Sequence, residues 1–500
     1  MHWADVEAEE LDPEPHIATG VAPSGPIHLG GLKELLTGEA IKRSSNGELT
    51  LIVDSFDPLR KLYPFLDEGY EKYIGMPLSE IPCPCGDHES YSEHYLQPFL
   101  EGLDRLGVDV KVEKAHEMYS EGRYERATEK ILNCKEEVKS IIEGKTGREL
   151  PKTWYPYNPL CGGCGTFGST EVIDFEDHYV KYECECGHEG RADIRSDDGK
   201  LPWRCDWPAR WWILGVKCEP FGKDHAASGG SWDTGKAIIE DVLEDDPPNP
   251  VIYEWVHLKG EGPMSSSKGV VVTVEESISM IGPEAVRFLM MKNKPNTQID
   301  FDTGLGILDL MDDFDEHEEI YFEDGDEDKT RIYELSQVED VPDEKPQRIP
   351  YRHLVNLIQI YDDPEKIWEV AQETGQITED KEKDFERFEK RAEHVKFWLE
   401  NYAPDMVKFS LKKELPEIEV DEEEKNFLRA YLNELDKVEW KSERLHQLVH
   451  ECAEEVDIQK GKAFRSFYKI LLGDKKGPRL GRFLSQLERD FVKERMNEAV

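Results

Sequence analysis

A strand that runs through a glycine-rich turn into a helix is the feature that most limits how this chain can fold. Residues His16–Val21 have the pattern of a short strand, and the stretch 20–31 contains four glycines. Apolar residues then recur at near-helical spacing, at Leu32, Leu35, Leu36 and Ile41. Backbone N–H groups at such a turn, with the positive end of the helix dipole, form a cradle for an anion. Many strand–helix turns share these residues, so the turn predicts a phosphate site only together with other motifs.

Further strands alternate with helical segments over the first 300 residues. They are predicted at Leu49–Val53, Val108–Val112, Cys218–Phe221 and Val251–Val256. This alternation predicts an α/β fold with a Rossmann-like parallel sheet, which we expect to comprise residues 1–72 and 201–310. Residues 73–200 hold prolines and cysteine clusters without a regular strand–helix rhythm, so we expect them to form an insertion.

The rest of the chain divides into an acidic segment and a helical one. Eleven Asp and Glu residues and no Lys or Arg lie between Met311 and Asp328, which is typical of a solvated linker or an exposed face. Residues 311–348 are therefore predicted to be an acidic connector. Stretches such as Phe385–Tyr402 and Glu423–Glu455 are rich in Glu, Lys, Leu and Arg. They predict an all-α domain over residues 349–500.

The composition is strongly acidic, with 107 Asp and Glu against 62 Lys and Arg and a net charge of −45. Aromatic residues make up 10% of the chain, which excludes a wholly disordered polyanion. No apolar run approaches the roughly 20 residues of a membrane span, and the acidic N-terminus does not resemble a signal peptide. We therefore expect a cytoplasmic protein. A salt-rich cytosol would screen such a surface, and we favour this halophilic interpretation over an ordinary acidic protein.

A second glycine- and serine-rich stretch, 260–269, follows a predicted strand far along the chain. It contains one lysine, Lys268, and three serines, Ser265, Ser266 and Ser267. A mobile loop of this kind can bring a cation and hydroxyl groups to a triphosphate and stabilise charge in the transition state. A plain polar turn is the alternative. His28, at the start of the first helix, can donate to a phosphate oxygen.

Together the two stretches resemble the HIGH and KMSKS signatures of class I aminoacyl-tRNA synthetases, with His28-Leu29-Gly30-Gly31 for the first and Met264 to Lys268 for the second. Longer strings, at 19–25, 56–61, 203–211, 219–226 and 253–260, resemble the archaeal type of class I lysyl-tRNA synthetase. The chain departs from the signatures at Gly31, Pro263 and Ser266, so that Lys268 is the single lysine of its loop.

The resemblance implies that the protein joins lysine to ATP with Mg²⁺ and transfers the lysyl group to tRNA(Lys). It implies catalytic roles for His28, Ser265, Ser267 and Lys268. It implies an ATP site that contains Pro23, Gly25, His28, Gly30, Gly31, Met264 and Lys268. It implies a lysine site that contains Gly20, Ala22, Trp203, Asp224 and His225.

The partner of the lysine ammonium group stays open in the sequence. An indole such as Trp203 can contribute roughly 0.5–2 kcal/mol by cation–π contact, and a carboxylate would contribute more. The candidate carboxylates, which lie in or near predicted strands, are Asp54, Asp57, Asp224 and Glu254. For Trp207 and Trp211, four residues apart, we favour burial in the core.

Two cysteine pairs predict a structural zinc site. Cys161 and Cys164 flank two glycines, and Cys184 and Cys186 follow some twenty residues later. Two such turns fit tetrahedral Zn²⁺, with His188 as an alternative to Cys186. The metal would stabilise an insertion that has little core of its own.

Cys83, Cys85 and His88, with His94 nearby, form a weaker candidate for a second metal site. The proline between the two cysteines restricts their turn, and no separate ligand pair is evident. We therefore favour an ordinary packing or substrate-facing loop at this place.

The segment 459–482 reverses the charge of the chain, with eight basic residues and one Asp. Aromatic residues lie among these charges, as in surfaces that stack on unpaired RNA bases. An amphipathic helix with a basic solvent face is the alternative. We expect tRNA contacts from Lys462, Arg465, Lys469, Lys475, Lys476, Arg479 and Arg482.

Three other functions remain possible at this point. They are a class I synthetase for another amino acid, a simpler nucleotidyltransferase, and a tRNA-binding protein that has lost catalysis. We expect a monomer.

Overall fold

The computed structural model describes residues 1–264, 271–323, 325–378 and 382–500. By its contacts the chain divides into two compact units. The first comprises Met1–Ile278, Pro283–Asp302 and His317–Val341, and the second comprises Ser279–Gly282, Thr303–Glu316 and Pro342–Val500.

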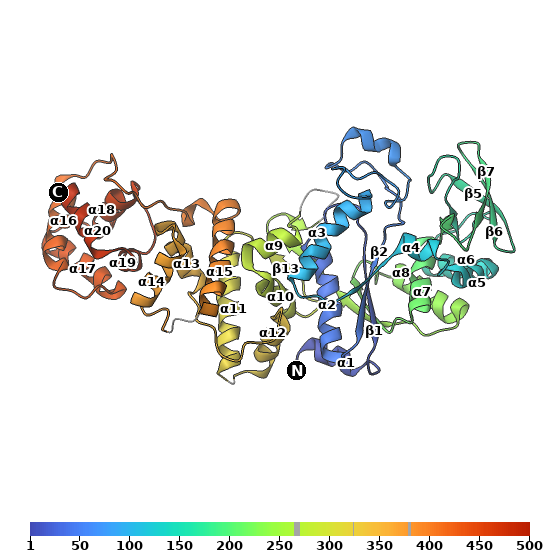
Figure 1. The fold of residues 1–500 in the computed structure, drawn as a ribbon, viewed down its shortest axis with the longest axis horizontal. Coiled ribbons are helices and arrows are strands. Elements are labelled where there is room, and N and C mark those ends of the chain that lie inside the picture. Colours follow the sequence, from blue (N-terminus) through green and yellow to red (C-terminus); the bar gives the residue numbers. More distant parts are fainter. Residues whose placement is uncertain (265–270, 324, 379–381) are drawn as a thin grey trace. The chain divides into compact units, whose positions relative to one another are not determined.

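A five-stranded parallel sheet forms the centre of the first unit, in the order β10-β9-β1-β2-β3 (Figure 1). Its strands are β1 (His16–Val21), β2 (Glu48–Val53), β3 (Lys111–Lys114), β9 (Cys218–Gly222) and β10 (Asn249–Tyr253). The chain leaves β1 for β2 and β3 on one side and later adds β9 and β10 on the other. Ligands of open α/β sheets bind at the carboxyl ends of the strands where the order reverses, which here lies between β1 and β9. The predicted parallel α/β fold is confirmed.

The sequence of the inner strands explains their position in this sheet. In β2, the five residues from Leu49 to Val53 are buried, as expected for a strand covered on both faces. Helix α2 (Leu29–Ser45) packs on β1, β2 and β9. Trp207 and Trp211 are 3% and 1% exposed, so the expected burial of both is confirmed.

The segment between β2 and α7 contributes one strand, β3, to the main sheet and also forms a separate small sheet. Its helices are α3 (Tyr91–Arg105), α4 (Ala115–Ser120), α5 (Glu125–Asn133) and α6 (Lys135–Thr146). The small antiparallel sheet consists of β5 (Thr170–Glu176), β6 (Tyr179–Cys184) and β7 (Glu189–Asp193), and β4 (Asn158–Pro159) pairs with β8 (Gly199–Lys200). Because β3 pairs with β2, the range 73–200 that we expected to form one insertion also supplies an edge strand to the main sheet.

The remaining elements between residues 3 and 336 are mostly helical. They are α1 (Trp3–Glu9), α7 (Trp203–Leu214), α8 (Ser231–Ile238), β11 (Val256–Leu258), β12 (Gly262–Pro263), α9 (Val274–Ile281), α10 (Pro283–Met291), β13 (Ile299–Phe301), α11 (Gly306–Phe322) and α12 (Glu327–Ser336). The acidic segment that we expected as a connector therefore forms α11 and α12. Met311 and Phe314 are each 2% exposed, so apolar residues between the acidic ones give α11 a buried face.

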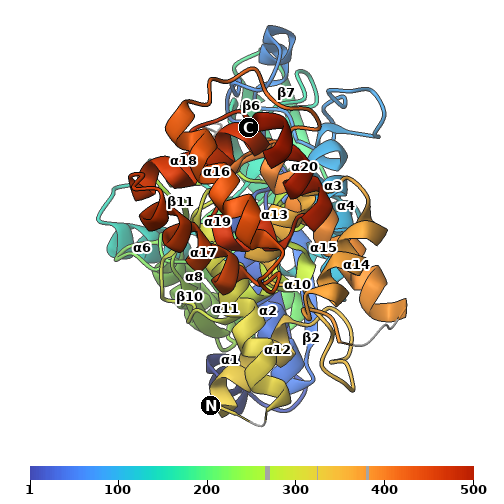
Figure 2. The same cartoon turned by 90° about the vertical axis from the view of Figure 1, so that its left-hand side faces the viewer.

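The second unit is helical after residue 349, which confirms the predicted all-α C-terminal region. Its helices are α13 (Tyr351–Ile360), α14 (Pro364–Glu373), α15 (Glu382–Asn401), α16 (Glu422–Leu435), α17 (Ser442–Glu455), α18 (Lys460–Leu472), α19 (Leu480–Ser485) and α20 (Arg489–Ala499). Figure 2 shows α16 to α20 grouped together, and they share a core that includes Phe427, Tyr431 and Phe467. The helical stretch 423–455 is broken into α16 and α17, and α16 begins with a capping box between Asp421 and Glu424.

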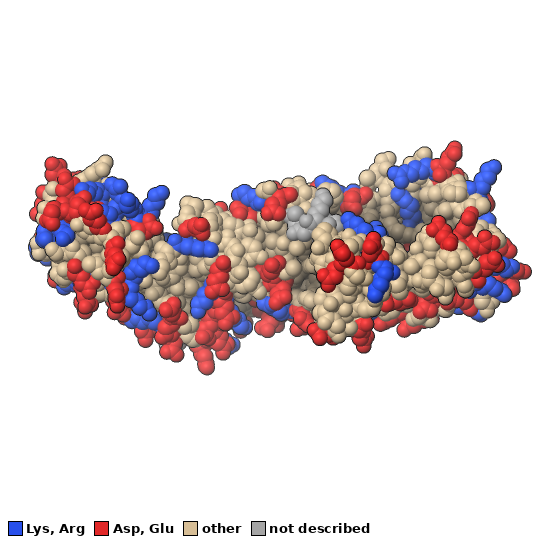
Figure 3. All heavy atoms as spheres, turned by 90° about the horizontal axis from the view of Figure 1, so that it is seen from above, with Lys and Arg blue, Asp and Glu red and all other residues tan. Residues whose placement is uncertain are grey.

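Acidic side chains are scattered among basic and uncharged ones on the face shown in Figure 3 and are not gathered in one patch. Among the helices of the described ranges, none combines the length and the apolar character that a membrane span requires.

Candidate active site

The glycine turn between β1 and α2 is held by its own residues and by α3. His28 is the N-cap of α2, and its Nδ1 accepts a hydrogen bond of 3.0 Å from the backbone N–H of Gly30. A Cβ atom at position 30 would lie 2.7 Å from His28 Cε1, so this close approach requires glycine. Pro23 and Gly25 are buried in the turn, and the Tyr91 hydroxyl donates to the Ser24 carbonyl at 2.8 Å.

This geometry fixes the protonation of His28. Burial lowers the pKa of His28 to about 4, so the ring is neutral near pH 7. Because Nδ1 accepts from Gly30, the single ring hydrogen of the neutral imidazole lies on Nε2. His28 therefore presents a neutral donor beside the N-terminus of α2, as the sequence led us to expect for a phosphate contact.

The chain that follows the serine–lysine loop pairs with the start of α2. Leu29 N–H donates to the Val272 carbonyl at 3.0 Å, and His28 and Thr273 form an antiparallel bridge. At the other end of the loop, Met264 is buried and donates its N–H to the Val256 carbonyl. Ser265, Ser267 and Lys268 lie outside the described residues. The structure thus brings residues 272–273, which follow the second signature, to the first signature.

Aromatic rings line the carboxyl end of β9. Trp203 begins α7, and its ring stacks on Trp207 with 5.3 Å between centroids and an interplanar angle of 15°. The His225 ring lies 5.9 Å from that of Trp203 and 5.3 Å from that of Trp207. The indole N–H groups of Trp207 and Trp211 both donate to the carboxylate of Glu219 in β9, and these hydrogen bonds hold the two rings in place. Trp203 and His225, both expected in a lysine site, therefore lie together.

Most of the carboxylates considered for the lysine ammonium already pair with protein cations. Asp54 accepts from Arg210 at 2.5 Å, Asp57 from Lys200 at 2.6 Å, and Glu254 lies 2.5 Å from Lys223. Arg210 is buried and also lies over the Trp203 ring, at 5.3 Å from its centroid. Asp54 thus links the end of β2 to α7, and Asp57 links the segment after β2 to Lys200 of β8, so both carboxylates already have a cation partner.

The sequence did not reveal Glu34, a half-buried carboxylate at the same edge of the sheet. Its Oε1 accepts from the Gly20 N–H at 2.8 Å, and its Oε2 accepts from the Tyr253 hydroxyl at 2.7 Å. Both donors are uncharged groups. Burial raises the pKa of Glu34 to about 7, and the nearby negative charge of Asp224 raises it further. The one signal in the sequence is an acidic residue between the apolar positions Leu32 and Leu35 of a helix.

Four cysteines gather in the small antiparallel region as the spacing predicted. The sulfur atoms of Cys161 and Cys186 are 3.6 Å apart, and those of Cys164 and Cys184 are 3.8 Å apart. Thiolates at about 2.3 Å from a tetrahedral Zn²⁺ would lie about 3.8 Å from one another. The arrangement fits zinc with Cys186 as the fourth ligand, the choice that we favoured over His188.

A second group of possible ligands forms where we favoured an ordinary loop. The ligand atoms of Cys83, Cys85, His88 and His94 all lie within 4.8 Å of one another. The Cys83 sulfur is 3.4 Å from His88 Nδ1, and the Cys85 sulfur is 3.3 Å from His94 Nδ1. Helix α3 supplies His94, which the sequence analysis had noted beside the other three, so the structure favours the metal-site interpretation over the ordinary loop that we preferred. Two sulfurs and two ring nitrogens form a donor set that suits zinc.

The basic residues that we expected to contact tRNA fall into two classes in the second unit. Lys462 lies 2.7 Å from both Asp421 and Glu423, and Lys469 lies 2.7 Å from Glu424. Arg465 donates to the carbonyl of Gly461, on its own helix. The side chains of the other four have no carboxylate partner among the described residues, and they are Lys475, Lys476, Arg479 and Arg482.

Comparison with known proteins agrees with this arrangement. The family model described as tRNA synthetases class I (K) matches residues 1–339, and a model described as an anticodon binding domain matches residues 367–500. The chain is 47% identical to a lysine–tRNA ligase of Archaeoglobus fulgidus, with 100% of both chains covered. It is 40% identical to one of Picrophilus torridus, with 99% of both covered.

Among solved structures, a glutamate tRNA ligase from Elizabethkingia meningosepticum aligns with a TM-score of 0.45 and 13% identity, over 97% of this chain and 99% of that one. The match of the class I model over 339 residues and the identity along the full length decide the family. The chain is a member of the class I (K) tRNA synthetases.

Proposed function

We propose that the protein is a lysine–tRNA ligase that activates lysine with ATP and transfers it to tRNA(Lys). The observation that carries this proposal is the pairing of His28 and Leu29 with Thr273 and Val272, which joins the glycine turn to the end of the serine–lysine loop. Full-length identity of 47% to a lysine–tRNA ligase supports lysine as the amino acid.

In the first step, a carboxylate oxygen of lysine attacks the α-phosphorus of ATP. The bond from that phosphorus to the bridging oxygen of the β-phosphate breaks, so the products are lysyl-adenylate and pyrophosphate. In the second step, a hydroxyl of the terminal ribose of tRNA attacks the lysyl carbonyl and AMP leaves. Both steps depend on positioning and on neutralisation of charge, and neither needs a covalent enzyme intermediate.

The residues of the glycine turn are suited to hold phosphate oxygens. His28 Nε2–H and the N-terminus of α2 donate hydrogen bonds there, together with the backbone of Gly30 and Gly31. Pro23, Gly25 and Met264 shape the ATP site. Ser265, Ser267 and Lys268 would meet the departing pyrophosphate, and Mg²⁺, when bound, would neutralise part of its charge.

The lysine substrate would lie between Trp203 and the carboxyl end of β1. A desolvated ammonium group needs a carboxylate, and Glu34 is half-buried and, among the described residues, accepts hydrogen bonds from two neutral groups, Gly20 N–H and the Tyr253 hydroxyl. The ammonium would favour the ionised form of Glu34, whose pKa burial has raised to about 7. Ala22, Asp224 and His225 complete the site that we propose.

The two cysteine clusters would each hold a structural Zn²⁺. In the first, Cys161, Cys164, Cys184 and Cys186 leave no open position for a substrate, so the metal would stabilise the β5–β7 region. In the second, Cys83, Cys85, His88 and His94 would fasten the segment after β2 to α3.

The acidic surface is consistent with a salt-rich cytoplasm, and we propose a halophilic archaeon as the source. At molar ionic strength, repulsion between surface carboxylates is screened over a few ångströms. We further propose that the chain acts as a monomer, with catalytic residues in 1–72 and 201–310 and tRNA recognition in 349–500.

Pyrophosphate exchange tests the proposed function. The purified protein, in high KCl and with tRNA(Lys), is expected to exchange pyrophosphate into ATP when lysine is added, and not when arginine or glutamate is added. Stimulation by arginine or glutamate alone would favour a synthetase for that amino acid. Full activity of a chain truncated near Met311 would favour a simpler nucleotidyltransferase, and tight tRNA binding without exchange would favour a protein that has lost catalysis.

A further inference from the structure

Tyr91 joins two segments of the first unit that lie far apart in the sequence. It is the first residue of α3 and is fully buried, and its hydroxyl donates a hydrogen bond of 2.8 Å to the Ser24 carbonyl. Ser24 lies between Pro23 and Gly25 in the turn that leads from β1 to α2, where we place the phosphates of ATP. Burial raises the pKa of Tyr91, so the phenol keeps its proton and remains a donor at neutral pH.

The turn around Ser24 has few other restraints. Within the described residues, the hydrogen bond from Tyr91 is the only one that Ser24 makes. Pro23 and Pro26, on either side, have no backbone N–H that could hold the turn. The position of this segment therefore depends on the place of the Tyr91 hydroxyl.

The first turn of α3 is fixed to the segment that follows β2. The backbone N–H of Tyr91 donates to the Ile81 carbonyl at 2.8 Å, and that of Ser92 donates to the Leu78 carbonyl at 3.1 Å. The Tyr91 ring packs in a small core with Leu59, Leu78 and Ile81. Whatever holds residues 78–88 in place thus also holds the Tyr91 side chain.

The second cysteine cluster restrains the same part of α3. His94 follows Tyr91 by three residues, so the two side chains leave α3 on the same face. The His94 Nδ1 atom lies 3.3 Å from the Cys85 sulfur and 3.6 Å from the Cys83 sulfur. A bound Zn²⁺ would tie α3 to residues 83–88 by bonds that are stronger than the hydrogen bonds at its first turn.

We infer that Tyr91 is a positioning residue of the ATP site and that it makes the affinity for ATP depend on the metal content of the second cysteine cluster. This inference rests on the proposed function, because it takes ATP as the ligand of the turn and zinc as the ligand of the cluster. His94 holds α3, the Tyr91 hydroxyl holds Ser24, and Ser24 holds the turn that presents its N–H groups to phosphate. When either link is lost, ATP must order the turn on binding and therefore binds more weakly.

Equilibrium binding of ATP to the zinc-loaded full chain tests the role of Tyr91. Tyr91→Phe removes only the hydroxyl, and it should raise the Kd for ATP about fivefold, the effect of one neutral hydrogen bond. The KM for ATP should rise likewise, with little change in kcat or in the KM for lysine. Tyr431→Phe is the matched control, because Tyr431 is buried in the second unit and its hydroxyl donates to the Leu445 carbonyl at 3.2 Å.

Thermal melting of these two variants separates a positioning role from a purely structural one. Each loses one buried hydrogen bond to a carbonyl, so both should show a similar decrease in Tm, but only Tyr91→Phe should bind ATP more weakly. Equal Kd values for ATP in the two variants would show that the Tyr91 hydroxyl serves stability alone.

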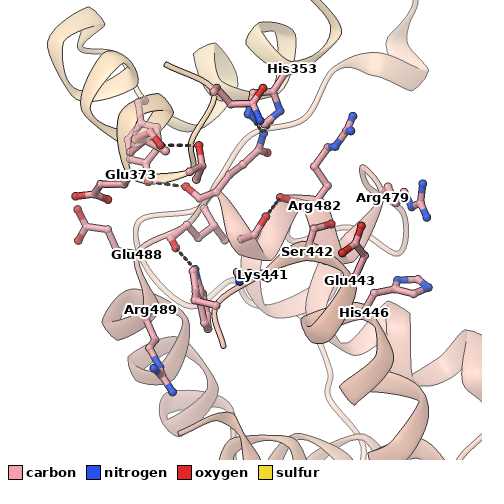
Figure 4. A pocket seen from close by; sticks show the side chains of 18 of the residues that line it. His353, Glu373, Lys441, Ser442, Glu443, His446, Arg479, Arg482, Glu488 and Arg489 are labelled. Carbon is pink, nitrogen blue, oxygen red and sulfur yellow. Dashed lines mark hydrogen bonds between the residues drawn. The ribbon is translucent and has the colours of Figure 1, made fainter. Parts of the chain in front are cut away.

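Tyr361 is a less suitable control, although its hydroxyl also donates to a backbone carbonyl. It lines a cavity of about 1200 Å³ in the second unit, whose walls carry Arg482 as well as Glu373 and Glu488 (Figure 4). Most of this lining lies within residues 367–500, which the anticodon-binding model matches, so a substitution there can also change tRNA binding. Tyr431 does not line this cavity.

A double-mutant cycle tests the coupling to the metal cluster. Cys85→Ser should lose one zinc ion and weaken ATP binding by about the same factor as Tyr91→Phe, and the double variant should bind ATP no more weakly than either single variant. Cys164→Ser, which loses the zinc ion of the other cluster, should leave the Kd for ATP unchanged. If Cys85→Ser does not fold, His88→Gln removes another ligand of the same cluster. Factors that multiply in the double variant would overturn the coupling, because they would show two independent effects.

The outcomes separate this inference from the proposed function. If the wild-type protein activates lysine but Tyr91→Phe binds ATP as Tyr431→Phe does, the inference is wrong and the proposed function stands. If ATP binding depends on Tyr91 and on the cluster but the wild-type protein never activates lysine, the function is wrong and the coupling stands. An unchanged Kd for ATP in a Cys85→Ser protein that has lost its zinc ion would also overturn the inference.

Discussion

The backbone N–H of Leu29 donates a 3.0 Å hydrogen bond to the carbonyl of Val272, although the two residues lie far apart in the sequence. Leu29 begins α2, and Val272 follows the serine–lysine loop by a few residues. This bond and the bridge between His28 and Thr273 fix one end of the loop beside the phosphate cradle. The structure therefore brings the segment that follows the second signature, residues 272–273, to the start of α2, where the first signature lies.

Removal of the loop lysine should abolish most of the activity. Lys268→Ala is expected to slow lysine-dependent pyrophosphate exchange by about 10²-fold or more, by analogy with the loss of one transition-state donor. Lys259→Ala is the control, because Lys259 precedes the same loop and pairs with Asp302 at 2.9 Å. Equal rates for the two variants would show that Lys268 does not meet the phosphates.

Two substitutions of His28 should separate its roles as cap and as donor. His28→Asn retains a side-chain acceptor for the Gly30 N–H but lacks the Nε2 donor, so it should lose about 10²-fold in exchange rate with little change in Tm. His28→Ala should lose the same activity and also about 1 kcal/mol of stability. Thermal melting and exchange assays measure both, and an active Asn variant would contradict the donor role.

The pKa of His28, lowered by burial to about 4, gives a further expectation for the same variants. Since the ring is neutral well above that value, its titration should not appear in the rate between pH 6 and pH 8. A loss of activity near pH 6.5 that disappears in His28→Asn would be the contrary result.

Glu34→Gln should impair lysine recognition and remove a pH dependence. Burial raises the pKa of Glu34 from 4.5 to about 7, so between these values the folded protein holds a proton that the unfolded chain has released. The contribution of this group to the free energy of unfolding therefore falls as the pH rises through that range. Lysine binding should favour the carboxylate and release up to one proton near pH 6.

Calorimetry in two buffers of different ionisation enthalpy measures that proton release. The wild-type protein and the surface control Glu240→Gln should release protons, whereas Glu34→Gln should not and should raise the KM for lysine far more than the KM for ATP. An unchanged KM for lysine in Glu34→Gln would assign the ammonium to another carboxylate.

Metal analysis should find two zinc ions for each chain. Cys164→Ser should lose one and Cys85→Ser the other, because each removes a ligand from a different cluster. Both variants should melt at lower temperature than Cys134→Ser, whose thiol belongs to neither cluster and serves as the control. A wild-type protein that binds a single zinc ion, with the same content in Cys85→Ser, would contradict the second site.

Stability should depend strongly on salt. Because the net charge is −45, raising KCl from about 0.1 M to about 2 M should raise Tm by several degrees through screening of carboxylate repulsion. Sucrose at equal osmolality does not screen charge and should not reproduce the full effect. A Tm that is independent of KCl would remove the support for a salt-rich environment.

Several features could be predicted from the sequence because they depend on local spacing. Apolar runs gave the inner strands β1, β2 and β9, and helical periodicity gave the C-terminal domain. The two cysteine turns predicted a cluster of four cysteines that could hold a metal ion, because each turn needs only neighbouring residues. Trp207 and Trp211 were assigned to the core because they recur after one helical turn.

Partners of individual side chains were decided only by the tertiary structure. Gly20, Glu34 and Tyr253 come from β1, α2 and β10, and nothing in their spacing shows that they meet. In the same way, only the folded chain shows that Asp54 pairs with Arg210. Local spacing sets the backbone and its periodicity, but the neighbour of a charge depends on which distant segments the core brings together. For the same reason, the sequence could not separate Lys462, which pairs with Asp421, from Arg479, which has no carboxylate partner among the described residues.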